Sequence, residues 1–228
     1  MMANNTQTAS FDVETARFNM VEQQIRPWDV LDQEVLNLML TLKRELFVPP
    51  ALQPLAFADL ELPLGVADAV MLTPKIEARL LQEVGAKPAD KVLEIGTGSG
   101  FMAALLAARA DSVLSVEINP ELAQQARDNL ARAGVENVTV ETGDAAHGWA
   151  QQAPYDLIVV SASLPLLPPA LLAQLKVGGR LVAIVGEAPV MNAQLVTCVA
   201  DGVFNSINLF ETVTAPLQNA SQPARFTF

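Results

Sequence analysis

Apolar residues follow a helical spacing through much of the first part of this chain. Residues 14–26 and 29–42 place apolar side chains three and four positions apart, which predicts two short helices separated near Pro27. The same spacing returns over residues 74–86. We therefore expect an N-terminal helical extension over residues 1–85.

Two segments of this extension lack a regular spacing. Residues 1–10 are polar and are expected to be frayed. Residues 47–74 hold five prolines, which indicates a loop-rich segment that can cover a ligand site. Thr73 at the N-cap position and Pro74 at the first helical position suit the start of the helix that follows.

From Lys91 onward, short apolar runs alternate with helical patterns. The expected strands are 91–95, 113–117, 138–142, 156–161 and 180–185, and the expected helices are 101–110, 120–133 and 168–176. Pro120 suits a helix start, Gly134 suits a helix end, and Gly178-Gly179 suits a turn into the fifth strand. Such alternation is typical of a parallel sheet with helices on both faces.

The end of the chain changes to an antiparallel pattern. Residues 193–200 and 203–212 flank Asp201-Gly202, a pair that favours a tight hairpin turn. The predicted fold class is therefore α/β, a Rossmann-like, doubly wound, mostly parallel seven-stranded sheet with a C-terminal antiparallel hairpin. Residues 86–228 would form this domain, with the N-terminal helical extension joined to it as one structural unit.

Composition narrows the choice of partners. The chain has 228 residues, 51% of them hydrophobic, and a formal net charge of −11, which disfavours nucleic acid and anionic membranes as partners. No targeting signal and no apolar run long enough to span a membrane is visible, so we expect a cytoplasmic protein. With one cysteine and one histidine the chain offers neither a disulfide nor a metal site; we expect Cys198 to be a core thiol and His147 a loop or site-rim residue.

Residues 91–100 read KVLEIGTGSG, a strand pattern that runs into three glycines before Phe101 opens a helix. Small residues at the end of a strand let a ligand approach the backbone. A dinucleotide fingerprint requires the spacing G-x-G-x-x-G, whereas Gly96, Gly98 and Gly100 follow G-x-G-x-G. This departure favours S-adenosylmethionine, which has no pyrophosphate, over NAD.

Acidic residues on the first three strands are the candidate ligand contacts. Glu117 ends the second strand and is the expected ribose acceptor, the alternative being a solvated strand-end acid. Asp144 follows the third strand and can contact the adenine or simply form an Asx turn. Glu94 lies inside the first strand, where burial would require loop amides or the ligand's amino group as a partner. The expected cofactor-binding residues are Glu94, Gly96, Thr97, Gly98, Gly100, Glu117, Ile118, Asp144 and Ala145.

Several longer stretches make the chain resemble the protein-L-isoaspartate O-methyltransferase family, which has the class I methyltransferase fold. The matching stretches are MVEQQIR at 20–26, RELFVP at 44–49, LPLG at 62–65, VLEIGTGSG at 92–100, SVEINPELAQQAR at 115–127, GDAAHGW at 143–149, PYDLIVVSAS at 154–163 and LPPALLAQLKVGGRLVAIVG at 167–186. The resemblance covers about residues 14 to 186, and beyond residue 187 we expect no match. It implies S-adenosylmethionine as the methyl donor and the carboxylate of an isoaspartyl residue in a damaged protein or peptide as the acceptor. The methyl ester would close to a succinimide and reopen partly as normal aspartate, which is protein repair.

One segment departs from the family pattern. Where the family reads G-x-G-Q-T-I-S-x-P, with the serine at the active site, residues 65–74 read GVADAVMLTP, one residue longer and without that serine. Thr73 is the candidate replacement, although it is also the expected N-cap, and Asp68 would repel an anionic acceptor. Ser161 and Ser163 lie near the expected site of methyl transfer but are expected to be turn residues.

Three hypotheses follow for the activity. The chain is an active isoaspartyl methyltransferase, a methyltransferase of the same fold with another acceptor such as a small molecule, or a cofactor-binding protein without turnover. The scarcity of histidine and cysteine does not argue against an enzyme, because a carboxylate acceptor is already ionised near pH 7 and needs no general base.

Overall fold

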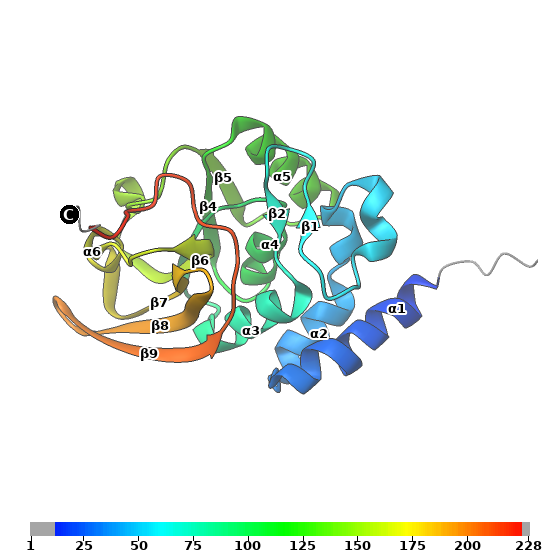
Figure 1. Ribbon diagram of the computed structural model, residues 1–228, viewed down its shortest axis with the longest axis horizontal. Coiled ribbons are helices and arrows are strands. Elements are labelled where there is room, and N and C mark those ends of the chain that lie inside the picture. The colour runs from blue at the N-terminus through cyan, green and yellow to red at the C-terminus, as the bar shows by residue number, and fades with distance from the viewer. Residues whose placement is uncertain (1–11, 225–228) are drawn as a thin grey trace, which may run out of the picture.

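The computed structural model describes residues 12–224, so the frayed segment expected over residues 1–10 lies outside the described part of the chain. The helices are α1 (Val13–Met20), α2 (Gln33–Thr41), α3 (Pro74–Val84), α4 (Phe101–Ala107), α5 (Pro120–Arg132) and α6 (Pro169–Leu172). The strands are β1 (Leu62–Pro63), β2 (Val70–Met71), β3 (Lys91–Ile95), β4 (Ser112–Glu117), β5 (Val138–Thr142), β6 (Tyr155–Leu164), β7 (Leu175–Glu187), β8 (Val190–Ala200) and β9 (Val203–Glu211). Figure 1 shows their arrangement.

Seven strands form one sheet in the order β5-β4-β3-β6-β7-β8-β9 (Figure 1). The neighbours from β5 to β7 are all parallel, whereas β8 is antiparallel to both β7 and β9. Asp201 and Gly202 make the turn between β8 and β9, and Gly202 takes the left-handed conformation, with φ of 67°, that such turns require. The predicted α/β fold with a mostly parallel seven-stranded sheet and a C-terminal hairpin is confirmed.

Successive strand residues point into two separate cores. Val92 and Val182 belong to the core that also contains the N-terminal helices, α3 and α4, whereas Leu93 and Leu181 belong to the core on the opposite face with α6. Cys198 is buried in the second core, so the expected core thiol is confirmed. The strands therefore read as nearly continuous apolar runs because both faces of the sheet are covered.

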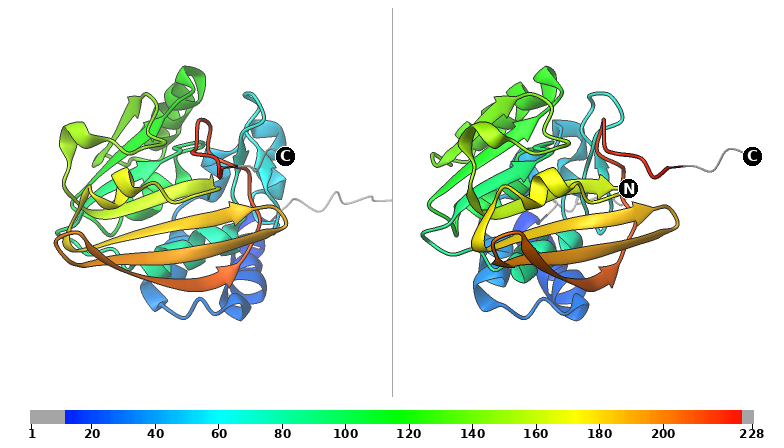
Figure 2. Two further views of the ribbon diagram at one scale, coloured as in Figure 1. Left: turned by 60° about the vertical axis from the view of Figure 1, so that its left-hand side comes forward. Right: turned by 90° about the vertical axis from the view of Figure 1, so that its left-hand side faces the viewer.

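The N-terminal helices pack beside α3 on one face of the sheet (Figure 2). The helix expected over residues 14–26 consists of α1, a π-helical turn over Val21–Ile25 and a 3-10 turn over Arg26–Trp28. The ring of Trp28 meets that of Phe210 in β9 edge-on, with 5.4 Å between centroids. The extension thus reaches from the middle of the sheet to its last strand. Within residues 12–224, no helix is long and apolar enough to cross a membrane.

Two predicted features between β6 and β7 are wrong. The helix expected over residues 168–176 is reduced to the four residues of α6, because β7 begins at residue 175 and pairs there with Tyr155. The turn expected at Gly178-Gly179 lies inside β7, in a bulge opposite β6. A Cβ at Gly179 would lie 2.8 Å from the carbonyl oxygen of Lys176, so the glycine permits close approach of the backbone.

Candidate active site

A cleft of about 360 Å³ opens at the carboxyl ends of β3, β4 and β6. One wall is formed by residues 67–70 and Leu72 of the β1–β2 hairpin, and another by the C-terminal residues 214–218. Between them lie Gly96 and Gly98 of the glycine loop, Glu117 and Ile118 at the end of β4, and Ser161 of β6. Ligands of open α/β sheets bind at this edge, where strand order reverses between β3 and β6. The structure therefore brings the predicted glycine loop and Glu117 together in one hollow.

The glycine loop has left-handed backbone at each of its glycines, with φ of 87° at Gly96, 52° at Gly98 and 86° at Gly100. A Cβ at Gly100 would also lie 3.4 Å from Ala126 of α5, which packs against this turn. Gly96 and Gly98 line the cleft. The loop therefore presents backbone to a ligand where other residues would present side chains.

Glu117 is held in place by backbone amides of the glycine loop and of the turn after β4. Its Oε2 accepts a hydrogen bond of 2.9 Å from Gly98 N, and its Oε1 accepts one of 3.0 Å from Asn119 N. The side chain is 5% exposed, so the alternative of a solvated strand-end acid does not fit the structure. Each carboxylate oxygen has a further lone pair, so the group can still accept the two hydroxyls of a ribose.

Asp144 forms the Asx turn that its sequence position suggests, and contact with the adenine stays a prediction. Its Oδ1 accepts a hydrogen bond of 2.9 Å from Ala146 N, which is an Asx turn, and its Oδ2 accepts one from the amide of Asn219. It also lines a hollow of about 20 Å³ next to the cleft, together with the predicted Ile118 and Ala145. This hollow adjoins the cleft, with which it shares Gly96, Glu117 and Ile118.

Glu94 is fully buried and is bound by serine hydroxyls; of its two expected partners, the loop amides do not bind it, and the ligand's amino group stays a prediction. Ser115 donates to its Oε2 at 2.6 Å and Ser161 donates to its Oε1 at 2.8 Å. The hydroxyl of Thr97 lies 2.6 Å from that of Ser115 and extends this network. Burial raises the pKa of Glu94 to about 8, and the two serine hydrogen bonds only partly oppose the shift.

The segment that departs from the family pattern forms one wall of the cleft. Asp68, Val70 and Leu72 line it, and among residues 65–74 no hydroxyl group does so. Thr73 occupies the N-cap position of α3, but its hydroxyl caps nothing and is buried without a hydrogen-bond partner. A catalytic role for Thr73 stays a prediction. Its neighbour Leu72 lines the cleft, whereas Thr73 does not.

The C-terminal segment is a part of the site that sequence reasoning missed. It runs from β9 back over the sheet beside β6 (Figures 1 and 2). Ser163 N donates to Ala215 O at 2.9 Å, Leu217 N donates to Ser163 O at 2.8 Å, and Ser163 Oγ donates to Thr214 O. Ser161 and Ser163 are therefore strand residues of β6, and the expectation that they lie in a turn is wrong. Ser161 binds Glu94, whereas Ser163 binds the C-terminal segment.

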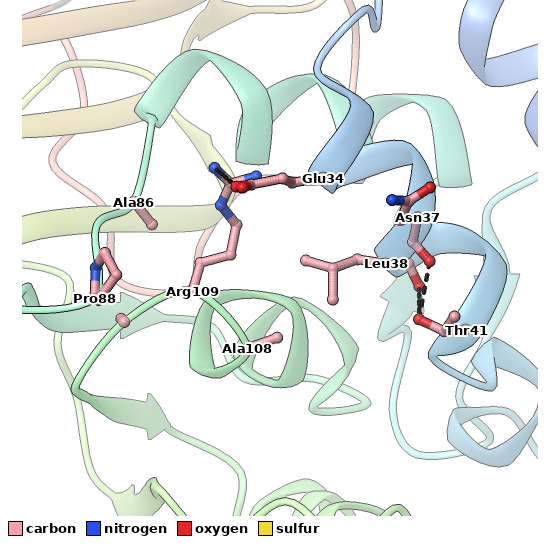
Figure 3. Close-up of a pocket in the computed structure, with 9 residues that line it drawn as sticks. Glu34, Asn37, Leu38, Thr41, Ala86, Pro88, Ala108 and Arg109 are labelled. Carbon is pink, nitrogen blue, oxygen red and sulfur yellow. Dashed lines mark hydrogen bonds and ion pairs between the residues drawn. The ribbon is translucent and has the colours of Figure 1, made fainter.

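A second hollow of about 470 Å³ lies at the other end of the sheet, near the amino ends of β3 and β4 (Figure 3). Arg109 points across it to Glu34, at 2.8 Å, and also pairs with Asp32. None of the predicted cofactor-binding residues lines this hollow. His147 lies exposed in a turn, and within the described residues no three His, Cys, Asp or Glu side chains gather as a metal site would require.

Known proteins similar to this chain share both its sequence and its fold. The family model of protein-L-isoaspartate(D-aspartate) O-methyltransferase matches residues 16–222. The match thus extends past residue 187, where the sequence had shown no resemblance, and includes the C-terminal segment. A protein-L-isoaspartate O-methyltransferase of Koribacter versatilis is 44% identical over 186 residues, 82% of each chain. One of Methanoculleus marisnigri is 48% identical over 170 residues, 75% of this chain and 77% of the other.

Solved structures agree in fold. A protein-L-isoaspartate O-methyltransferase structure superposes with a TM-score of 0.76 at 25% identity and covers 91% of this chain and 66% of the other. A Plasmodium falciparum structure, named for the same activity and in complex with S-adenosyl-L-homocysteine, has a TM-score of 0.74 at 18% identity and covers 91% of this chain and 98% of the other.

Proposed function

Because the chain belongs to the protein-L-isoaspartate(D-aspartate) O-methyltransferase family, we propose that it methylates the carboxylate of isoaspartyl residues in damaged proteins. The observation that carries this proposal is the cleft at the carboxyl ends of β3, β4 and β6, where the glycine loop and the buried Glu117 meet. When bound, S-adenosylmethionine supplies a methyl group on a sulfonium centre.

The residues present fit an adenosyl ligand along the length of the cleft. Glu117 would hold the ribose hydroxyls, and Asp144 with Ile118 and Ala145 would contact the adenine. Glu94 and Thr97 would lie at the methionyl end, below the loop. The free lone pairs of Glu117 and the absence of side chains at Gly96 and Gly98 support this assignment.

The role that we assign to the cleft is to hold the acceptor carboxylate next to the methyl group of the cofactor. A bound S-adenosylmethionine would supply its methyl group to an oxygen of an ionised acceptor carboxylate, and the electron pair of the broken carbon–sulfur bond would stay on sulfur. No proton moves, so no general base is needed. The hairpin residues 67–72 and the tail residues 214–218 flank the cleft and would position the acceptor and exclude water.

The proposed partner is an isoaspartyl protein or peptide, and the proposed compartment is the cytoplasm. The net charge of −11 supports a partner other than nucleic acid or an anionic membrane. A single buried thiol at Cys198 is compatible with a reducing compartment.

The direct test incubates the protein and labelled S-adenosylmethionine with an isoaspartyl peptide or with the same peptide containing normal aspartate. Base-labile label on the isoaspartyl peptide alone is the expected result. At limiting cofactor, Glu117→Ala should lower the transfer about 10- to 100-fold, whereas Glu136→Ala, which changes an exposed acid in the loop before β5, should not alter it. Measurable cofactor binding without label on the isoaspartyl peptide would rule out this acceptor.

The altered hairpin favours one second candidate, a methyltransferase of the same fold with a different acceptor. Asp68 contributes a negative charge at the rim of the cleft, and Val70 and Leu72 contribute apolar walls where the family has hydroxyl groups. Such a wall suits an uncharged or cationic acceptor better than a carboxylate. Asp68→Asn distinguishes the two, since it should improve methylation of an isoaspartyl peptide if the carboxylate is the acceptor.

A further inference from the structure

Two carboxylates line a small cavity beneath the cleft. The cavity has a volume of about 20 Å³, room for one water-sized group, and it shares Val70, Gly96 and Ser161 with the cleft above it. One carboxylate is Glu94 of β3, and the other is Glu77, in the first turn of α3. Sequence reasoning assigned no role to Glu77.

Glu77 is almost fully buried and only half satisfied. Its Oε2 accepts a hydrogen bond from Nη1 of Arg44, while the remaining donors of Arg44 bind Ala56 O at 2.9 Å and Leu72 O at 2.6 Å. The residue is 3% exposed, and among the described residues its Oε1 has no hydrogen-bond partner. This oxygen is not among the side-chain atoms that are buried without a partner, so it is accessible from the cavity that Glu77 lines and can accept a hydrogen bond from a ligand there.

When both of its carboxylates are ionised, the charges around the cavity call for a cation. Of the described residues that line it, Glu77 and Glu94 are the only ionisable ones, and both are acids. Arg44, behind Glu77, offsets a single negative charge. The two carboxylates line the same cavity of about 20 Å³, and the charges of Glu117 and Glu77 add to burial in raising the pKa of Glu94. A small cationic donor in the cavity would satisfy both.

We propose that Glu77 is a second carboxylate of the cofactor site, where it and Glu94 together bind the α-ammonium group at the methionyl end. The proposal rests on the proposed function, because it takes an adenosyl ligand to be what enters the cleft. An ammonium group is about the size of a water molecule and carries three donors, which matches the cavity and its unsatisfied oxygen. The ligand class is an adenosyl thioether or sulfonium with a free α-ammonium group.

The test compares three ligands by titration calorimetry on wild type and Glu77→Gln. S-adenosylhomocysteine and its decarboxylated analogue both carry the ammonium group, whereas 5′-methylthioadenosine lacks it. Glu77→Gln should weaken binding of the first two about 10-fold or more, the loss expected for one charge-assisted hydrogen bond. It should leave 5′-methylthioadenosine within about 2-fold of wild type, within the spread of surface substitutions.

Two further variants separate binding from structure. Glu83→Gln removes an acid of the same helix that pairs with Arg79 outside the cavity, and it should leave all three affinities unchanged. The double variant Arg44→Met/Glu77→Gln removes both buried charges, so it folds without an unpaired Arg44. It should still show the loss confined to ligands with an ammonium group.

Each outcome decides between the proposals. Wild-type affinity for S-adenosylhomocysteine in Glu77→Gln or in the double variant would overturn the role of Glu77, and so would an equal loss for all three ligands. If wild type itself binds none of the ligands, the proposed function fails instead. If wild type binds all three and only the ammonium-bearing ligands weaken in the variants, both proposals stand.

Discussion

Binding of S-adenosylhomocysteine should strengthen as the pH rises, because Glu94 must lose its proton to receive an ammonium group. Burial raises the pKa of Glu94 to about 8. At pH 7 about one Glu94 side chain in ten is ionised, so deprotonation on binding costs about 1.4 kcal/mol. At pH 9 this cost is close to zero. Glu94 alone should therefore raise the affinity about 10-fold between pH 7 and pH 9, and Glu77, whose pKa burial raises to about 7, should add to this rise.

Titration calorimetry between pH 6 and pH 9, in two buffers of different ionisation enthalpy, measures both the affinity and the protons released. Glu94→Gln is the matched control, because it keeps the shape of the side chain and any titration of the ligand but has no proton to lose. Its profile should be flatter than that of wild type. A wild-type affinity that is constant over this range, or the same slope in Glu94→Gln, would refute the reasoning.

The remaining predictions concern stability and the walls of the cleft. Without ligand, the free energy of unfolding should fall from about pH 5 to pH 8, because folded Glu94 keeps a proton that the unfolded chain, with a pKa near 4.3, has released; urea titrations at several pH values check this. Glu117→Ala should weaken S-adenosylhomocysteine binding about 10- to 100-fold in calorimetry, and unchanged affinity would mean that the ribose lies elsewhere. Gly100→Ala should lower the free energy of unfolding by about 1–3 kcal/mol in urea denaturation, since a φ of 86° strains any residue that carries a Cβ. Ser163→Ala should speed ligand dissociation in stopped-flow measurements, because it frees part of the tail, and an unchanged rate would contradict this role.

The local spacing of apolar residues predicts most of the strands and helices, because each of these elements buries its own apolar side. The strands expected over residues 91–95 and 138–142 have these bounds in the structure, and the helix expected over 120–133 differs by one residue. The helix expected over 168–176 fails because pairing with β6 draws its last residues into β7. That pairing depends on contacts between distant parts of the chain, which no local window contains.

The candidate site likewise contains residues that the sequence predicts and residues that only the fold brings together. The glycine loop and Glu117 directly follow strands, so the rule that ligands bind at the carboxyl ends of strands is enough to place them. Ser115 and Ser161 reach Glu94 from the strands on either side of β3, which is a result of strand order. Glu77 looks from the sequence like an ordinary acid in the first turn of a helix, and only the fold reveals Arg44 behind it.

The C-terminal segment affects when this protein can begin to work during its own synthesis. A chain that has been translated only through β9 contains the whole sheet, the glycine loop and every acid assigned to the cofactor. It still lacks residues 214–218, which form one side of the cleft and attach to β6 through Ser163. Tight ligand binding should therefore be acquired only once residues 214–218 have been made, and a nascent chain that stops before them would carry a folded sheet with an open site.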